Sequence, residues 1–149
     1  MVDEPSRSKR DRLLHRLTRS SSVIDHISFG VSDLVRSALF YDAALAPLGF
    51  VRVWSFESAV GYGYPNQDDR FAIKHEAAES VASSHRTHLA FTADTRQAAA
   101  GFHAAAMAQG AIDEGAPGLC PEYGEGYYAA FVRDPDGYRL EAVCHEKRS

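Results

Sequence analysis

The sequence predicts an α+β protein made of two βαβββ modules, which together form a curved mixed sheet with helices on its outer face. The main observation is an internal repeat: His26 returns 62 positions later as His88, and the residues that follow both histidines match without a gap. Phe40 matches Phe102 in this alignment. A repeat of this kind predicts two copies of one structural unit. The second observation is that each copy shows the same order of strand and helix patterns.

Module one is expected to cover residues 22–75. Residues 23–31 alternate as a strand does, with His26 and Ser28 on the face opposite the apolar side chains. Ser32 and Asp33 have short oxygen-bearing side chains that cap helices, and we expect the helix to run to about residue 46. Three more strands are expected, at residues 50–56, 60–64 and 71–74.

Module two is expected to cover residues 86–146. A strand at 87–93 leads to a helix that Asp94 is predicted to cap and Gly110 to end. A short strand at 111–114 and a glycine-rich loop at 115–126 follow. The turn Asp134-Pro135-Asp136-Gly137 then predicts a hairpin between strands at 127–133 and 138–144. The order is again βαβββ.

Charge and composition exclude several classes of function. Residues 1–20 hold six Lys/Arg against three acids, a net of +3, which leaves −7 for the remainder of a chain whose net charge is −4. An acidic body does not attract nucleic acid, and we expect residues 1–21 to be a flexible basic tail. No apolar run approaches the roughly 20 residues of a membrane span. The absence of a signal peptide and of a cysteine framework favours a cytoplasmic protein.

Three residues form a candidate metal site. Strand alternation places His26 and His88 on the helix-free faces of their strands, and Glu141 on the same kind of face in the last strand. Two histidines and one carboxylate suit Fe(II), Mn(II), Zn(II) or Ni(II). We therefore expect a divalent metal ion, held by His26, His88 and Glu141, with its identity open.

Other side chains are candidates for catalysis and substrate binding. Alignment of strand ends matches Lys74 to Glu141, so module one would supply an ammonium in place of a second carboxylate. Lys74 is a candidate base, and Glu141 and Tyr128 are candidate proton carriers or hydrogen-bond donors. The residues expected to contact substrate are Tyr62, Tyr127 and Ser28.

These motifs resemble the vicinal oxygen chelate superfamily, which includes glyoxalase I, type I extradiol dioxygenases, fosfomycin-resistance thiol transferases and bleomycin-binding proteins. The resemblance covers about residues 23–145. It rests on Asp25-His26-Ile27, Phe40-Tyr41, Leu48-Gly49-Phe50, His88-Leu89-Ala90-Phe91 and the segment from Asp134 to Glu141. It implies a glyoxalase-like fold and metal positions at His26, Lys74, His88 and Glu141.

The resemblance implies a metal-dependent enzyme of lyase, dioxygenase or thiol-transferase type, acting on a small oxygen-rich substrate. Lys74 departs from the four-ligand pattern of glyoxalase I, which argues against lactoylglutathione lyase activity itself. The alternative is a metal-free binding or resistance protein in which Lys74 pairs with Glu141. Relatives of this kind often pair across chains, so a homodimer is expected, with the modules pairing either within one chain or between two.

Overall fold

The computed structural model describes residues 22–81 and 87–146, and the predicted basic tail lies outside these residues. Module one contains strands β1 to β4, two helices and one 3-10 turn. Their bounds are β1 Ile27–Val31, α2 Leu34–Leu45, η1 Ala46–Leu48, β2 Val51–Phe56, β3 Ala59–Gly63, β4 Phe71–His75 and α3 Ala78–Val81. Asp33 caps α2 by accepting a hydrogen bond from the Arg36 amide, as predicted.

Module two repeats the arrangement. Its elements are β5 His88–Thr92, α4 Arg96–Ala108, β6 Ile112–Leu119, η3 Pro121–Tyr123, β7 Tyr127–Arg133 and β8 Arg139–His145. The predicted cap of α4 is wrong by one residue, because the Thr95 side chain and not Asp94 accepts from the Ala98 amide at 3.0 Å. The α+β class and the βαβββ order of both modules are confirmed.

Two strand boundaries differ from prediction for identifiable reasons. The first strand begins at Ile27, where pairing with Phe71 of β4 begins, and Val23 is fully exposed. β6 runs to Leu119, well into the predicted glycine-rich loop, because it pairs with β7 despite its glycines. β6 lies at the edge of its sheet, where Pro117 removes no essential ladder hydrogen bond.

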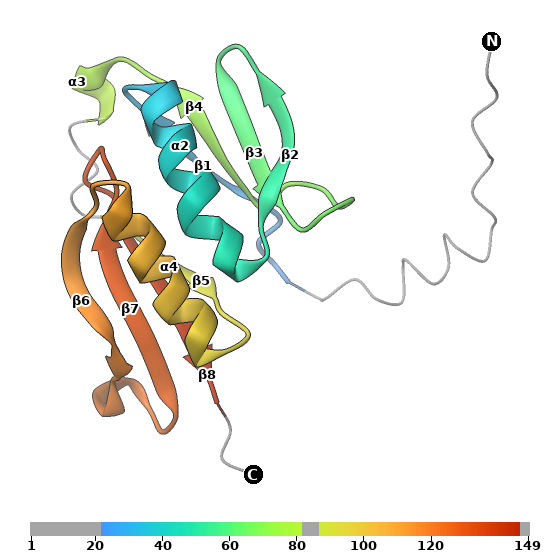
Figure 1. Cartoon of the computed structure of the whole chain (residues 1–149). Helices are drawn as coiled ribbons and strands as arrows, with labels where there is room; N and C mark the ends of the chain where they lie inside the picture. The colour runs from blue at the N-terminus through green and yellow to red at the C-terminus, as the bar shows by residue number, and fades with distance from the viewer. Residues whose placement is uncertain (1–21, 82–86, 147–149) are drawn as a thin grey trace, which may run out of the picture.

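Within one chain the strands form two four-stranded sheets, ordered β1-β4-β3-β2 and β5-β8-β7-β6. Figure 1 shows α2 and α4 side by side in the middle of the molecule, with one sheet on either side of the pair. Each sheet therefore has a helix-covered face and a second face without a helix, which we call its open face. β1 and β5 are edge strands of their sheets.

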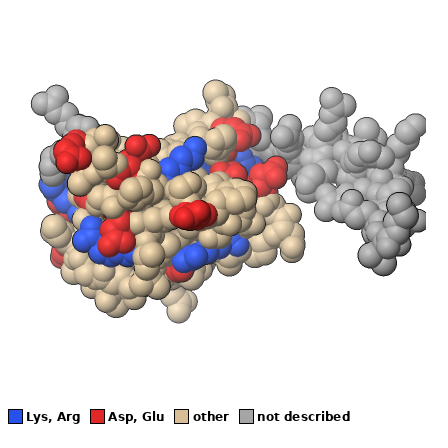
Figure 2. All heavy atoms as spheres, turned by 90° about the horizontal axis from the view of Figure 1, so that it is seen from above, with Lys and Arg blue, Asp and Glu red and all other residues tan. Residues whose placement is uncertain are grey.

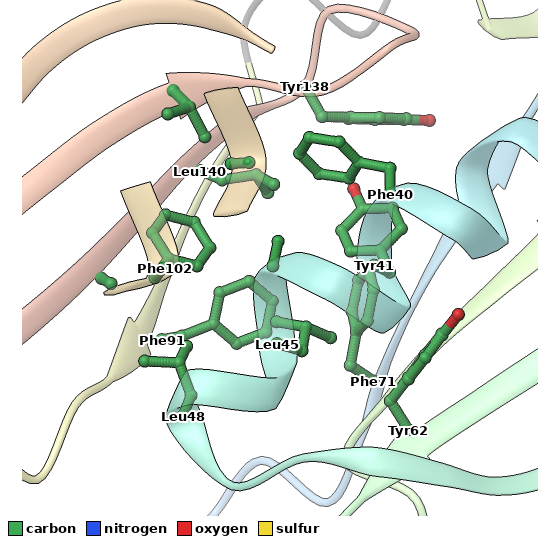
Figure 3. Packing of buried hydrophobic residues seen from close by; sticks show 14 of the residues in the cluster. Phe40, Tyr41, Leu45, Leu48, Tyr62, Phe71, Phe91, Phe102, Tyr138 and Leu140 are labelled. Atoms are coloured by element: carbon green, nitrogen blue, oxygen red, sulfur yellow. The ribbon is translucent and has the colours of Figure 1, made fainter. Parts of the chain in front are cut away.

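The core lies between the helices and the sheets and draws on both modules. Figure 3 shows rings from both halves meeting there, among them Phe71 of β4 and Phe91 of β5, whose centroids are 5.4 Å apart. Phe102 of α4 is fully buried in the same cluster. This shared apolar burial is the main force that holds the modules together.

The turn between β7 and β8 also joins the modules through buried polar contacts. Asp134 accepts a hydrogen bond from the Tyr41 hydroxyl at 2.5 Å, and Asp136 accepts from the Ser32 hydroxyl at 2.5 Å. The Tyr138 hydroxyl donates to the Gly30 carbonyl at 2.8 Å. The predicted turn thus holds the start of α2 as well as closing a hairpin.

Charges of both signs are mixed on the face seen in Figure 2. The face seen in Figure 2 carries acidic and basic side chains interspersed among uncharged ones, so it presents no extended basic area for phosphates. In the described part of the chain, every helix is too short or too polar to cross a membrane.

Candidate functional site

Glu141 is the centre of the candidate site. The alternation of β8 sends Leu140, Ala142 and Cys144 into the core and turns Glu141 to the open face. Its side chain is nevertheless only 3% exposed. A buried carboxylate requires partners, and it has two: Oε2 lies 2.9 Å from His88 Nε2, and Oε1 accepts a hydrogen bond from the Tyr127 hydroxyl.

Tyr127 comes from the first position of β7 and pairs with His145, four residues beyond Glu141 on β8. Burial and the hydrogen bond to Glu141 raise the pKa of Tyr127 well above its ordinary value, so its hydroxyl remains a donor at neutral pH. The rings of Tyr127 and His145 are perpendicular to each other, with their centroids 5.0 Å apart. Tyr127 therefore holds one carboxylate oxygen of Glu141 in place, while the other oxygen faces His88.

The predicted convergence of His88 and Glu141 is present in the structure. His88 opens β5, the parallel neighbour of β8, and its side chain is half exposed. Two ligands that each lie roughly 2.0–2.2 Å from one ion, at about a right angle, are about 3 Å apart. The His88 and Glu141 donor atoms have this separation, and nitrogen and carboxylate oxygen are suitable ligands for the predicted ions.

His26 lies elsewhere in the same chain. It precedes β1 in module one, is exposed, and its Nδ1 lies 2.8 Å from Asp25 Oδ1. Among residues 22–81 and 87–146, the structure contains no group of three or more His, Cys, Asp or Glu side chains placed to hold a metal. One chain thus brings together two of the three predicted ligands.

The predicted equivalence of Lys74 and Glu141 is wrong. His88 pairs with Arg139 in register, and the matching pairs of module one set Ile27 against Phe71. Counting from these pairs, Ala72 occupies the position of Glu141, and Lys74 lies one open-face position further along. Loops of different length between the copies caused the error. Lys74 is exposed, and the basic side chain that contacts Glu141 is His88.

Two predicted tyrosines point away from the open faces. Tyr62 is fully buried under α2, where its hydroxyl bonds to the Ala38 carbonyl and lies 3.1 Å from Asp42. Tyr128 packs against the core with Arg96 over its ring at 5.3 Å. The structure therefore contradicts substrate contact for Tyr62 and a catalytic role for Tyr128 beside Glu141.

Ser28 is exposed on the same strand face as predicted, on the open side of module one. The open faces also carry aromatic residues that sequence reasoning did not select. Phe131 lies directly across from Glu141 on β7. Trp54 and Phe56 lie on β2, with ring centroids 5.4 Å apart. A bulge between Arg52 and Trp54 reverses the alternation of β2 and turns Trp54 to the open face.

Comparisons with known proteins agree with this architecture. The family model described as "Glyoxalase/Bleomycin resistance protein/Dioxygenase superfamily" matches residues 23–142. A glyoxalase/bleomycin resistance protein from Albidiferax ferrireducens T118 is 32% identical, with a TM-score of 0.70 over 84% of this chain and 100% of its own. A search of curated proteins gave no match.

More distant structures share the fold. A glyoxalase/bleomycin resistance protein/dioxygenase family enzyme from Burkholderia phytofirmans PsJN is 18% identical, with a TM-score of 0.64 over 84% of this chain and 100% of its own. The fosfomycin resistance protein FosX from Listeria monocytogenes is 15% identical, with a TM-score of 0.61 over 85% and 96%. From the family match over residues 23–142 and the 32% identity to the protein from Albidiferax ferrireducens, the chain belongs to the glyoxalase/bleomycin resistance protein/dioxygenase superfamily.

Proposed function

We propose that this protein is a divalent-metal-dependent enzyme that acts on a small oxygen-rich substrate, by lyase, dioxygenase or thiol-transferase chemistry. The observation that carries the proposal is the 2.9 Å approach of His88 Nε2 to the buried Glu141 carboxylate. His88 and Glu141 Oε2 would hold the ion, which supplies Lewis acidity for a developing negative charge on substrate oxygen. Tyr127 keeps Glu141 in place through its other oxygen.

The third ligand, His26, is proposed to come from a second copy of the chain. Two features support this. His26 and His88 stand at the starts of β1 and β5, and both are edge strands whose outer backbone groups are available for pairing. A symmetric dimer that sets β1 of one chain near β5 of the other would create two equivalent sites. This also gives a reason for the expected homodimer.

Metal analysis tests the first part of the proposal. Protein purified without chelator, and then supplied with Mn(II), Fe(II), Zn(II) or Ni(II), should bind about one ion per chain. His88→Ala and Glu141→Gln should lose it. The matched control is His103→Ala, which breaks the 2.9 Å contact between His103 of α4 and Asp113 of β6, a second histidine–carboxylate pair. Wild-type protein that binds none of these ions would refute metal dependence.

Mixing two defective variants tests the shared site. His26→Ala and His88→Ala homodimers should each lack metal, because every site in them misses one ligand. After unfolding and refolding as a mixture, half of the dimers are mixed, and each has one intact site. Metal binding should then return to about a quarter of an ion per chain. No recovery in a verified mixed dimer would show that the chains do not share ligands.

A metal-free binding protein remains the second candidate, and one observation favours it. Glu141 is already satisfied by His88 and Tyr127, so the site does not require a cation to be stable. The pairing with Lys74 that sequence suggested is not part of this candidate. Protein that binds no metal under any of the conditions above, yet binds a small molecule at the open faces, would favour it.

A further inference from the structure

We propose that the open face of module one binds the planar aromatic part of an anionic substrate, with Trp54 and Phe56 as the contact surface and Lys74 as the partner of the negative charge. This names the substrate class for the proposed site. The inference rests on the proposed function for its setting, but binding of the ligand requires no metal and is tested without it.

Trp54 lies flat on the sheet. A Cβ built on Gly61 would be 2.1 Å from Cε2, 2.4 Å from Nε1 and 2.6 Å from Cζ2 of Trp54. Gly61 is therefore the residue that lets the indole rest directly on β3. The side of the ring that is turned away from the sheet faces outward, and Trp54 as a whole is only half-buried. A flat, supported ring of this kind is suited to stacking with another planar group.

Phe56 extends this surface. Its ring lies 5.4 Å from that of Trp54, and 71% of the residue is exposed. An exposed phenylalanine on an edge strand gains little from folding, since most of its apolar area stays in water. Its position beside Trp54 on the face of His26 and Ser28 is explained if it contacts a ligand. The two rings form a continuous apolar area on the open face of module one.

Lys74 supplies the charge. Register pairs place Phe56 against Ala59 and Ala59 against Lys74, so the three lie in one row across the strands. Strands are about 4.8 Å apart, which puts the Cα atoms of Phe56 and Lys74 roughly 10 Å apart. Lys74 is exposed and forms no ion pair with a described residue. Glu76 lies beyond it, over Gly30, on the side away from Phe56.

A bicyclic aromatic carboxylate spans this distance. Its rings would stack on Trp54 and Phe56, and its carboxylate would reach the Lys74 ammonium. An uncharged aromatic alcohol would keep the stacking and lose the charge contact. A saturated carboxylate would keep the charge and lose the stacking. These three ligands separate the two parts of the proposed recognition.

Trp54 makes the test direct, because it is the only tryptophan of the chain. We would titrate full-length protein, without added metal, with naphthoate, naphthylmethanol and cyclohexanecarboxylate, and follow tryptophan emission. Naphthoate should quench Trp54 saturably and bind more tightly than either of the others. Phe56→Ala should weaken naphthoate about 3- to 10-fold. Lys74→Met should weaken naphthoate and leave naphthylmethanol unchanged.

Leu39→Ala is the matched control, since Leu39 is an exposed apolar residue on α2. It should bind naphthoate as the wild type does. Equal binding of naphthoate by wild type and Phe56→Ala, or of naphthoate and naphthylmethanol by wild type, would overturn the proposal. Trp54 emission that responds to protein concentration and not to naphthoate would also overturn it, because a second copy would then cover this surface. Because the titration contains no metal, His88→Ala should bind naphthoate as the wild type does. This variant therefore separates a failure of the naphthoate site from a failure of the metal site.

Discussion

Replacement of Asp134 by Asn should remove a pH-dependent loss of stability. Burial raises the pKa of Asp134 from 3.8 to about 6, although hydrogen bonds from Tyr41 and two backbone amides act in the opposite direction. In the unfolded chain the carboxyl titrates near its ordinary value. Between pH 4 and 6 the folded state therefore retains a proton that the unfolded state has lost, and raising the pH favours unfolding.

The size of the effect follows from the pKa difference. A difference of about 2 corresponds to about 3 kcal/mol. This part of the free energy of unfolding should be fully present below about pH 4 and lost by about pH 7. Asp134→Asn cannot ionise. Its side-chain oxygen can still accept from the Asp136 and Tyr138 amides, both at 2.9 Å, while its NH₂ group donates to the Tyr41 hydroxyl.

The assay is urea unfolding by circular dichroism at a series of pH values from about 4 to 7.5. The variant should lose less stability than the wild type as pH rises, and should be the more stable protein at pH 7 by up to about 3 kcal/mol. Tyr41→Phe is the contrasting variant: it removes a donor to the carboxylate and should steepen the pH dependence. Parallel curves for wild type and Asp134→Asn would refute the reasoning.

Two further changes test the open faces. Gly61→Ala should force Trp54 off the sheet, lower the free energy of unfolding by about 1–3 kcal/mol and shift tryptophan emission to longer wavelength. Gly118→Ala, where the nearest atom is 3.9 Å from the added carbon, should change neither the stability nor the spectrum. A native-like spectrum for Gly61→Ala would contradict this prediction. Tyr127→Phe should release one oxygen of Glu141 and weaken metal binding about 10-fold in a competition titration with a chelator, and unchanged affinity would show that Tyr127 does not position Glu141.

Much of the fold could be predicted because local patterns and the repeat agreed with each other. The alternation of β8 was enough to turn Glu141 away from the helices, and the repeat was enough to set His88 beside it. Both inferences need only side-chain periodicity, which a sequence contains. The predicted role of His26 stays a prediction, because it depends on how copies of the chain pair.

The errors have a different physical origin. Ala72 rather than Lys74 matches Glu141, because the register of a parallel strand pair is set by the partner strand. The loops of the two repeats differ in length, so the register cannot be read from spacing along the sequence. Trp54 was missed because a bulge displaces one residue and inverts the faces beyond it. Tyr62 was misplaced because a tyrosine fits a strand equally well on either face, and the partner of its hydroxyl, Asp42, lies on a helix.

The polar contacts of the β7–β8 turn bear on how the duplicated halves depend on each other. Asp134 and Asp136 belong to one repeat, and the hydroxyls they bind belong to the other. A polypeptide that contained only one repeat would therefore leave an acid or a hydroxyl without its partner, and it would expose the apolar surface that the two modules share. Neither half should therefore fold on its own, and the two should unfold in one cooperative transition.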